Sequence, residues 1–365
     1  MKKLSVLFIA LFLFSTPLIY SQDDHNAGAG GMQFFDGTWT EVLAAAKEQN
    51  KYIFVDAFAD WCVPCKWMTK NVFPTEEAGK FYNEHFIVYK LDMEKGEGVD
   101  FAKKYKVKVY PSYLFFNSDG ELVHRTVGSK PVDKFIEDGK NALNTDMQLM
   151  TLNKKYDEGD RSEQFLYNYA FALSNAYQDQ MKIAEVTTAY LDTQKDEDLT
   201  NEKNWKVIDK LLYNINSHAF KYLEENKDKF SSKYGEEKVD KKILNTKIEY
   251  YKFMKDWDEY AKTAVNFADK YAKDDWQMLN GFAWDFYENV NDNAMMKKAE
   301  QWAKRSMELE KNYYNTDTYA SILYKLGKYD DALKNANDAI ELAKKSGDKY
   351  GGTEKLIEKI KSKQK

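Results

Sequence analysis

The sequence predicts an α/β domain followed by an all-α domain of helical repeats. Apolar, strand-like runs alternate with helix signals from Phe34 to about residue 146, whereas the later chain has helical periodicity throughout. All five prolines lie at or before Pro131, so none interrupts the later helices. The length of 365 residues also exceeds what one hydrophobic core normally serves, which favours two or three domains.

The first 21 residues have the pattern of a secretory signal peptide. Two lysines precede an apolar run over residues 4–14, and Pro17 ends it. The run is shorter than the roughly 20 residues that a membrane span needs. An uncleaved anchor stays an alternative because residues 18–20 are again apolar. Export would place the protein in the periplasm or outside the cell, without an integral membrane span after cleavage. We expect residues 22–33 to form a flexible, glycine-rich lead-in.

The α/β region, residues 34–146, opens with a helix and a strand. Thr38 followed by Glu41 is a capping box, which predicts a helix running to about Gln49. Residues 51–59 are almost wholly apolar apart from Asp56, as expected for a central strand that is buried on both faces. A second helix is predicted to begin around Cys62.

The remaining elements of this region continue the alternation. A helix is predicted over residues 75–83, a strand over 86–92 and a short helix over 99–105. Residues 113–116 and 121–127 flank a Ser-Asp-Gly turn, which indicates a hairpin. Pro131 is expected to start the closing helix of the domain.

The helical region has a partial repeat. Residues 147–275 are predicted to form helical hairpins without a clear period. Within residues 276–365, one segment has tetratricopeptide spacing, carried by Tyr319, Ala320, Leu323, Gly327, Tyr329, Ala332, Ala336 and Ala339. A blurred copy lies one repeat length earlier, at Ala299, Ala303 and Ser306. Two interpretations stay open: a groove that binds peptides, or a packing extension that stabilises or dimerises the protein.

Composition argues against several functions. The net charge is −5 with acids and bases interleaved, and no basic stripe suggests nucleic-acid binding. The four histidines are dispersed along the chain and there is no second cysteine pair, so a zinc site lacks ligands. We therefore expect neither a metal nor an organic cofactor.

Both cysteines of the chain lie in one Cys-x-x-Cys motif, Trp61-Cys62-Val63-Pro64-Cys65-Lys66, at the junction between a predicted strand and a predicted helix. Two thiols one helical turn apart can close into a disulfide and reopen, so the pair can exchange two electrons with another dithiol. A static structural disulfide is the alternative, but a loop this short would stabilise the fold little.

The sequence around this motif resembles the thioredoxin superfamily from Phe34 to about Asn144. The matching segments are Val55 to Lys66, Lys90-Leu91-Asp92, Tyr110-Pro111-Ser112 and Val127-Gly128. The resemblance implies a thioredoxin fold, in which helices flank a central mixed sheet, and a thiol-disulfide oxidoreductase activity. It looks nearest to exported members with a Trp-Cys-x-x-Cys-Lys site, whose partners lie in the periplasm.

Four residues are predicted to carry the chemistry. Cys62 would lie at a helix N-terminus, where free N–H groups and the helix dipole favour a thiolate, and would be the attacking nucleophile. Cys65, one turn further, would be shielded and would resolve the mixed disulfide. Asp56 would be buried beneath the pair, with a raised pKa, and would accept the proton of Cys65. By resemblance Lys90 lies near Asp56. A tolerated buried acid paired with Lys90 is the alternative.

The expected substrate-binding surface comprises Trp61, Val63, Pro64, Tyr110 and Pro111. Trp61 would cover the thiols and offer an apolar face to a partner. By resemblance Pro111 is cis and faces the disulfide, and the backbone of Tyr110 pairs with an extended client segment. Tyr110 departs from the threonine or branched aliphatic residue that is frequent in the family, which leaves client preference open. The alternative for Trp61 and Tyr110 is simple cover of the core.

These patterns predict an exported protein-disulfide reductase or isomerase. Its partners would be client proteins with disulfides or thiols and an upstream redox protein as electron donor, and the helical repeats would position clients. The Val-Pro dipeptide lacks the histidine of strongly oxidising relatives, which argues against an oxidase. The alternatives are an interaction scaffold with an incidental dithiol, and a holdase that uses an aromatic helical groove.

Overall fold

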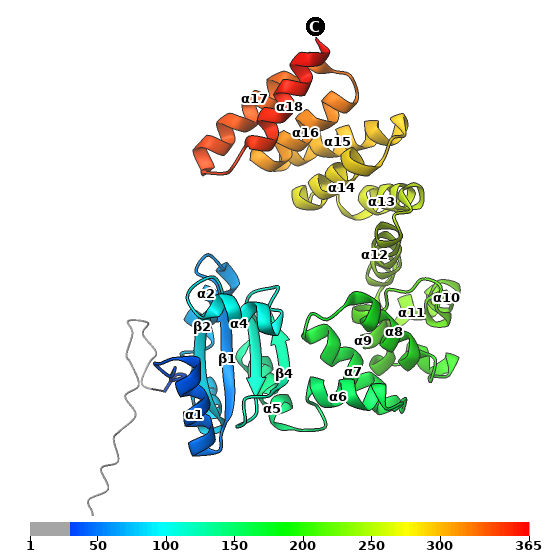
Figure 1. Cartoon of the computed structure of the whole chain (residues 1–365). Coiled ribbons are helices and arrows are strands. Elements are labelled where there is room, and N and C mark those ends of the chain that lie inside the picture. Colours follow the sequence, from blue (N-terminus) through cyan, green and yellow to red (C-terminus); the bar gives the residue numbers. More distant parts are fainter. Residues whose placement is uncertain (1–29, 365) are drawn as a thin grey trace, which may run out of the picture. The chain divides into compact units, whose positions relative to one another are not determined.

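The computed structural model describes residues 30–364 (Figure 1). Within these residues a four-stranded mixed sheet with flanking helices is followed by an all-helical region, which confirms the predicted fold class. The predicted signal peptide and residues 22–29 of the predicted lead-in lie outside the described residues. The chain divides into two compact units, the first ending at Val186 and the second beginning at Thr187. None of the described helices combines the length and the apolar character needed to span a bilayer.

The sheet places β1 (Tyr52–Phe58) at its centre, in the strand order β2-β1-β3-β4. β2 (Phe86–Asp92) pairs with β1 in parallel, and β3 (Ser112–Phe116) pairs with its other side in antiparallel. β4 (Leu122–Val127) completes the predicted hairpin with β3. Because β1 is flanked on both sides and covered on both faces, residues in its middle are removed from water, as the apolar run predicts.

Five helices flank the sheet, at the positions that the sequence predicts within one or two residues: α1 (Trp39–Gln49), α2 (Val63–Asn71), α3 (Glu76–His85), α4 (Gly98–Tyr105) and α5 (Val132–Leu143). The predicted capping box is present, because Thr38 and Glu41 each accept a hydrogen bond from the other's backbone N–H. α2 follows β1 after a short turn, which places the N-terminus of α2 near the end of the central strand.

Strand alternation separates two apolar layers. One face of β1 carries Val55 and Ala57 and packs with residues of α1 and α4. The other face carries Phe54 and packs with Met68 of α2, residues of α3, and Phe135 of α5. Asp56 lies between Val55 and Ala57 in the strand, so its side chain is on the Phe54 face, under α2 and α5.

The described chain begins with a segment that packs against the domain. The Met32 N–H donates to the Phe73 carbonyl at 2.8 Å, and the Met32 side chain is buried. This segment passes very close to α3, since a Cβ at Gly79 would lie 1.9 Å from the Gly30 carbonyl oxygen. Only glycine fits at position 79. The packed structure therefore includes residues 30–33.

The first compact unit extends beyond the sheet into three helices, α6 (Leu149–Asp157), α7 (Glu163–Asn175) and α8 (Gln180–Leu191), of which the last runs into the second unit. α6 and α7 contact β4. The Leu149 N–H at the start of α6 donates to Nδ1 of the buried His124 of β4 at 3.1 Å. Burial, assisted by Lys130, lowers the pKa of His124 to about 4, so the ring is neutral and can accept this bond.

The regular elements of the second unit, within its described residues, are all helices: η1 (Asp196–Thr200), α9 (Glu202–Leu211), α10 (His218–Glu225), α11 (Lys227–Tyr234), α12 (Glu236–Met254), α13 (Trp257–Tyr271), α14 (Trp276–Asn289), α15 (Asn293–Leu309), α16 (Tyr313–Lys325), α17 (Tyr329–Ser346) and α18 (Gly351–Lys363). From α14 to α18 each helix packs on the next, and α14 also contacts α16. Ala320, Ala332 and Ala336 are fully buried between helices. Gly327, with φ +77°, lies in the turn after α16, where a side chain would be strained. This packing is compatible with helical repeats.

Candidate active site

A disulfide joins Cys62 and Cys65 at the start of α2. Cys62 is the N-cap residue, and its Sγ accepts a hydrogen bond from the Cys65 N–H at 3.1 Å. Pro64 lies in the first helical turn, where the missing N–H costs nothing. When the disulfide opens, the unpaired N–H groups and the positive end of the helix dipole face the Cys62 sulfur and stabilise its thiolate.

The closed disulfide is buried, and large apolar side chains beside it are exposed. Cys62 is 1% exposed and Cys65 is 4% exposed, so this oxidised state does not show the predicted contrast between an accessible and a shielded sulfur. By contrast Trp61 is 65% and Val63 is 74% exposed. Trp67, one turn after Val63 on α2, is also exposed and was not predicted from the sequence.

Trp61 and Tyr110 frame the disulfide from two loops. The Trp61 indole N–H donates to the Glu94 carboxylate at 3.0 Å, which fixes the orientation of the ring. The Trp61 and Tyr110 rings meet edge to face with centroids 5.9 Å apart, and Tyr110 packs against the small cluster that contains both cysteines. Glu94 carries no predicted role; its position two residues after β2 is the only signal that could have indicated it.

The peptide bond between Tyr110 and Pro111 is cis. The Pro111 carbonyl accepts a hydrogen bond from the Gly128 N–H at 2.9 Å, which ties the start of β3 to the end of β4. Among the described residues we find no backbone hydrogen bond to the N–H or carbonyl of Tyr110. Backbone groups without an internal partner are the kind with which an extended segment of another chain can pair.

Asp56 is the buried acid of the site. Its side chain is 1% exposed, and its Oδ1 has no hydrogen-bond partner among the described residues. Burial raises the pKa of Asp56 to about 7, against an opposing effect of the positive charge on Lys90. A carboxyl group with this pKa can accept and release a proton near neutral pH.

Lys90 lies directly opposite Asp56 in the parallel register of β1 and β2. However, no ion pair joins the two side chains in the described structure. The Lys90 ammonium instead donates to Thr69 Oγ1 of α2 at 3.4 Å and lies 4.6 Å from the centroid of the Phe58 ring. The geometry of the described residues therefore does not show a simple Asp56–Lys90 ion pair. The positive charge of Lys90 still lowers the pKa of Asp56 from a longer distance.

A row of polar side chains crosses the sheet at the level of Asp56. Lys90, Asp56, Tyr113 and Thr126 occupy equivalent positions on β2, β1, β3 and β4. Tyr113 is fully buried, and its hydroxyl has no hydrogen-bond partner among the described residues. Sequence reasoning gave Tyr113 no role. The available signal was its hydroxyl within an otherwise apolar hairpin strand.

The far end of the row is a buried ion pair. Asp138 of α5 accepts a hydrogen bond from Thr126 Oγ1 at 2.7 Å and pairs with the Lys130 ammonium at 2.5 Å. Burial raises the pKa of Asp138, and Lys130 and Thr126 oppose the shift. Asp138, the second buried carboxyl on this face, therefore has its own charge partner, whereas Asp56 has no charged group in contact.

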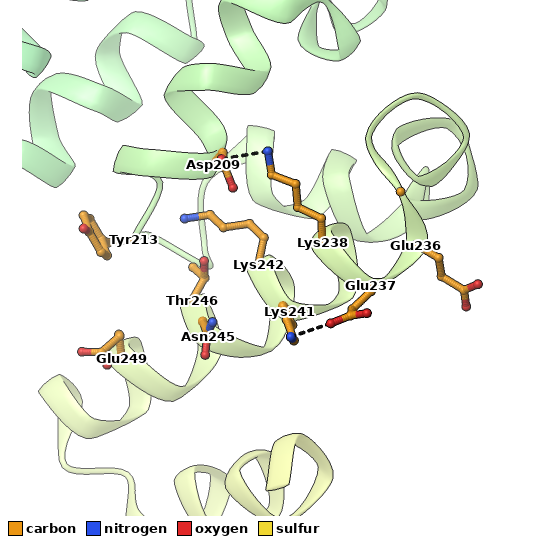
Figure 2. Close-up of a pocket in the computed structure, with 11 residues that line it drawn as sticks. Asp209, Tyr213, Glu236, Glu237, Lys238, Lys241, Lys242, Asn245, Thr246 and Glu249 are labelled. Carbon is orange, nitrogen blue, oxygen red and sulfur yellow. Dashed lines mark ion pairs between the residues drawn. The ribbon is translucent and has the colours of Figure 1, made fainter. Parts of the chain in front are cut away.

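The second unit has a separate cavity of about 670 Å³ between α9 and α12 (Figure 2). Lys238 pairs with Asp209 at 3.3 Å and Lys241 pairs with Glu237 at 2.5 Å. The third lysine, Lys242, donates to the Leu212 carbonyl at 3.0 Å, and burial lowers its pKa to about 8. Because these lysines already have partners, the cavity indicates no particular class of ligand, and we assign it no role.

Comparison with known proteins identifies the α/β domain. Residues 39–142 match the thioredoxin-like domain family. Thioredoxin H4 of Arabidopsis thaliana is 35% identical over 95 residues, which are 26% of this chain and 75% of that protein. The thiol:disulfide interchange protein DsbD of Pseudoalteromonas atlantica is 32% identical over 106 residues, 28% of this chain and 18% of DsbD. A candidate disulphide-isomerase of Bacteroides thetaiotaomicron, solved in solution, is 41% identical, with 32% of this chain and 98% of that chain covered and a TM-score of 0.31.

The chain therefore belongs to the thioredoxin-like family of thiol-disulfide oxidoreductases. Its enzymatic class is protein-disulfide oxidoreductase, with Cys62 and Cys65 as the redox pair. The family match covers residues 39–142, which lie within the α/β domain.

Proposed function

We propose that this protein is an exported thiol-disulfide oxidoreductase that reduces or isomerises disulfides in client proteins. The observation that carries the proposal is the Cys62–Cys65 disulfide at the N-terminus of α2. Tyr110, which precedes the cis-proline, packs against the cluster that holds the disulfide, and α2 covers the face of β1 that carries the buried Asp56. A disulfide that served only to stabilise the fold would need neither a helix N-terminus nor a nearby acid.

The first step is attack by Cys62. In the reduced enzyme the Cys62 thiolate attacks one sulfur of a client disulfide, and the new sulfur–sulfur bond forms as the client bond breaks. The other client sulfur leaves as a thiolate and takes a proton from water. The helix N-terminus supports this step because it stabilises the thiolate of Cys62.

The second step is resolution by Cys65. The Cys65 thiol gives its proton to the Asp56 carboxylate, and the resulting thiolate attacks the Cys62 sulfur. The bond between Cys62 and the client breaks, the Cys62–Cys65 disulfide closes, and the client has gained two electrons. Because Asp56 has a pKa of about 7, its carboxylate is basic enough to take this proton and still ionised in part at neutral pH.

Clients bind across the apolar surface around the disulfide. The exposed Trp61 and Val63, together with Pro64, offer contact area, and the free backbone groups of Tyr110 beside Pro111 pair with an extended client strand. Since Glu94 holds the Trp61 indole, this part of the surface is organised before a client arrives.

The cycle requires an upstream redox protein that returns two electrons to the disulfide. The Val63-Pro64 dipeptide contains no histidine to stabilise the thiolate further, which favours a reductase or isomerase over an oxidase. The signal-peptide pattern of the first 21 residues supports export to the periplasm or beyond. The tetratricopeptide-like helices would recruit or position clients.

Trapping of mixed disulfides tests this proposal. Full-length Cys65→Ser protein can form the Cys62–client bond but cannot resolve it, so exported client proteins should accumulate as adducts that dissolve on reduction. The matched control is the Cys62→Ser, Cys65→Ser double variant, which should form none. Equal recovery of partners by both variants, independent of reductant, would instead favour the interaction scaffold.

A further inference from the structure

We propose that Tyr113 is a positioning residue for Asp56: through one internal water its hydroxyl donates the hydrogen bond that stabilises the Asp56 carboxylate. The relevance for catalysis rests on the proposed function, in which Asp56 accepts the Cys65 proton. The pairing of Tyr113 with Asp56 itself rests only on the geometry of the sheet.

The register of the sheet places the two residues side by side. Asp56 and Tyr113 are direct partners in the antiparallel pairing of β1 and β3. Directly opposed residues have their side chains on the same face, with Cβ atoms about 5 Å apart. The shared face is the one covered by α2 and α5, since Tyr113 packs in one cluster with Phe54 and Met68.

Both side chains are buried and both carry a polar atom without a partner. The Asp56 Oδ1 and the Tyr113 hydroxyl are two of the few buried side-chain atoms in the described structure that lack a hydrogen bond. Buried polar atoms in folded proteins almost always have a partner, which is frequently an ordered water. The two groups form no direct hydrogen bond, so a bridging water accounts for both atoms at once.

The neighbouring polar groups on this face already have hydrogen-bond partners of their own. Lys90, which faces Asp56 from β2, donates to Thr69. On the other side of Tyr113, the Asp138 carboxylate pairs with Lys130 and accepts a hydrogen bond from Thr126. From α3, the Tyr82 hydroxyl donates to the Phe135 carbonyl at 2.7 Å. From α2, the disulfide of Cys65 carries no proton to donate. The Tyr113 hydroxyl, by contrast, has no hydrogen-bond partner among the described residues, and Tyr113 lies directly opposite Asp56 on β3.

The chemistry of the pair fits a donor and an acceptor. Burial raises the pKa of Tyr113 well above its ordinary value, and Asp56 and then Asp138 raise it further. Tyr113 is therefore a neutral phenol at any pH at which the enzyme works, and it can only donate to a carboxylate. During resolution the proton moves from Cys65 Sγ to an Asp56 carboxylate oxygen and later to solvent, while Tyr113 keeps its own proton.

The test is a pH titration of the Asp56 carboxyl carbon by carbon-13 NMR in the oxidised, full-length protein, with Asp56→Asn used for assignment. Tyr113→Phe removes only the hydroxyl, and the expected result is an upward shift of the Asp56 midpoint by about one pH unit, a tenfold change in proton affinity. The matched control is Tyr82→Phe, which removes a second buried hydroxyl from the same face and should leave the midpoint in place.

An unchanged midpoint in Tyr113→Phe, or an equal shift in Tyr82→Phe, would overturn the inference. If Tyr113→Phe fails to fold, the unmodified protein provides the answer: the ring Cζ resonance of Tyr113 should titrate with the Asp56 midpoint and should lose that response in Asp56→Asn. A Cζ resonance that ignores Asp56 would equally overturn it.

A kinetic measurement separates this inference from the proposed function. In the reduction of insulin disulfides with dithiothreitol as the reductant, Tyr113→Phe should move the acid limb of the pH–rate profile upward by the same amount and should have no further effect in an Asp56→Asn background. If insulin is not reduced at all but the carboxyl titration shifts, the positioning role stands and the proposed function fails. If the carboxyl titration shifts and the acid limb does not follow it, Tyr113 has no role in catalysis.

Discussion

At the scale of single residues, the protonation of Asp56 couples the stability of the domain to its chemistry. Burial raises the Asp56 pKa from 3.8 to about 7, so between these pH values the folded chain keeps a proton that the unfolded chain has released. The proton on Asp56 therefore stabilises the folded state in full below pH 3.8, and this stabilisation is lost as the pH rises through 7. At neutral pH the domain therefore holds a buried carboxyl whose ionisation opposes folding.

Replacement of Asp56 by Asn should accordingly stabilise the domain at alkaline pH. A shift of about three pH units corresponds to about 4 kcal/mol, expected in full near pH 8 and absent near pH 4. Hydrogen exchange of the β1 amides, which reports the opening free energy of the central strand, measures the effect. Asp119→Asn, at an exposed turn position, is the control. A destabilised β1 in Asp56→Asn at pH 8 would contradict this assignment.

At the scale of elements, the contact between α6 and β4 depends on a neutral histidine. The Leu149 N–H at the first turn of α6 donates to His124 Nδ1, and a protonated ring would lose this acceptor and would face the positive end of the helix dipole. Burial holds the His124 pKa at about 4, below its ordinary value of 6.5. The neutral His124 ring contributes its full stabilisation of the folded state above pH 6.5, and this stabilisation is lost as the pH falls toward 4.

Acidification should therefore loosen α6 before the sheet unfolds. Between pH 6.5 and pH 4 the expected loss is about 3 kcal/mol, visible as reduced hydrogen-exchange protection of the Leu149 amide. In His124→Gln the side-chain carbonyl can still accept the bond and does not titrate, so this pH dependence should disappear. An identical acid response in both proteins would show that another group controls the contact.

The positions of the strands and helices in the α/β domain could be predicted because their signals are local. The capping box of α1, the apolar run of β1 and the turn residues of the β3–β4 hairpin each lie within a few neighbouring positions. The redox pair could be predicted for the same reason, since its two cysteines are only three residues apart.

Contacts that depend on register or on long-range packing were not visible in the sequence. The place of Tyr113 beside Asp56 requires the β1–β3 register, and a slip of one residue would turn Tyr113 to the other face. The bond from His124 to the start of α6 requires the docking of a helix onto a distant strand. The hydrogen bond between Trp61 and Glu94 likewise joins two loops, and no local pattern marks it.

At the scale of the whole molecule, the chain combines a redox domain with a large helical region. Both cysteines of the chain lie in the active-site motif, so no other thiol competes for the disulfide. The helical region starts within the first compact unit, where α6 and α7 cover β4, an edge strand of the sheet. The helices therefore pack directly on the redox domain at β4, where the Leu149 N–H of α6 bonds to His124.

The central claim is that the N-terminus of α2 lowers the proton affinity of Cys62, and the rate of Cys62 alkylation as a function of pH tests it most directly. The measurement uses full-length Cys65→Ser protein, in which Cys62 is the single thiol, with the same protein unfolded in denaturant as the control. We predict a folded-state midpoint well below the value of about 8.5 for an ordinary thiol, which the unfolded control should show. A folded-state midpoint at or above that of the control would contradict the account.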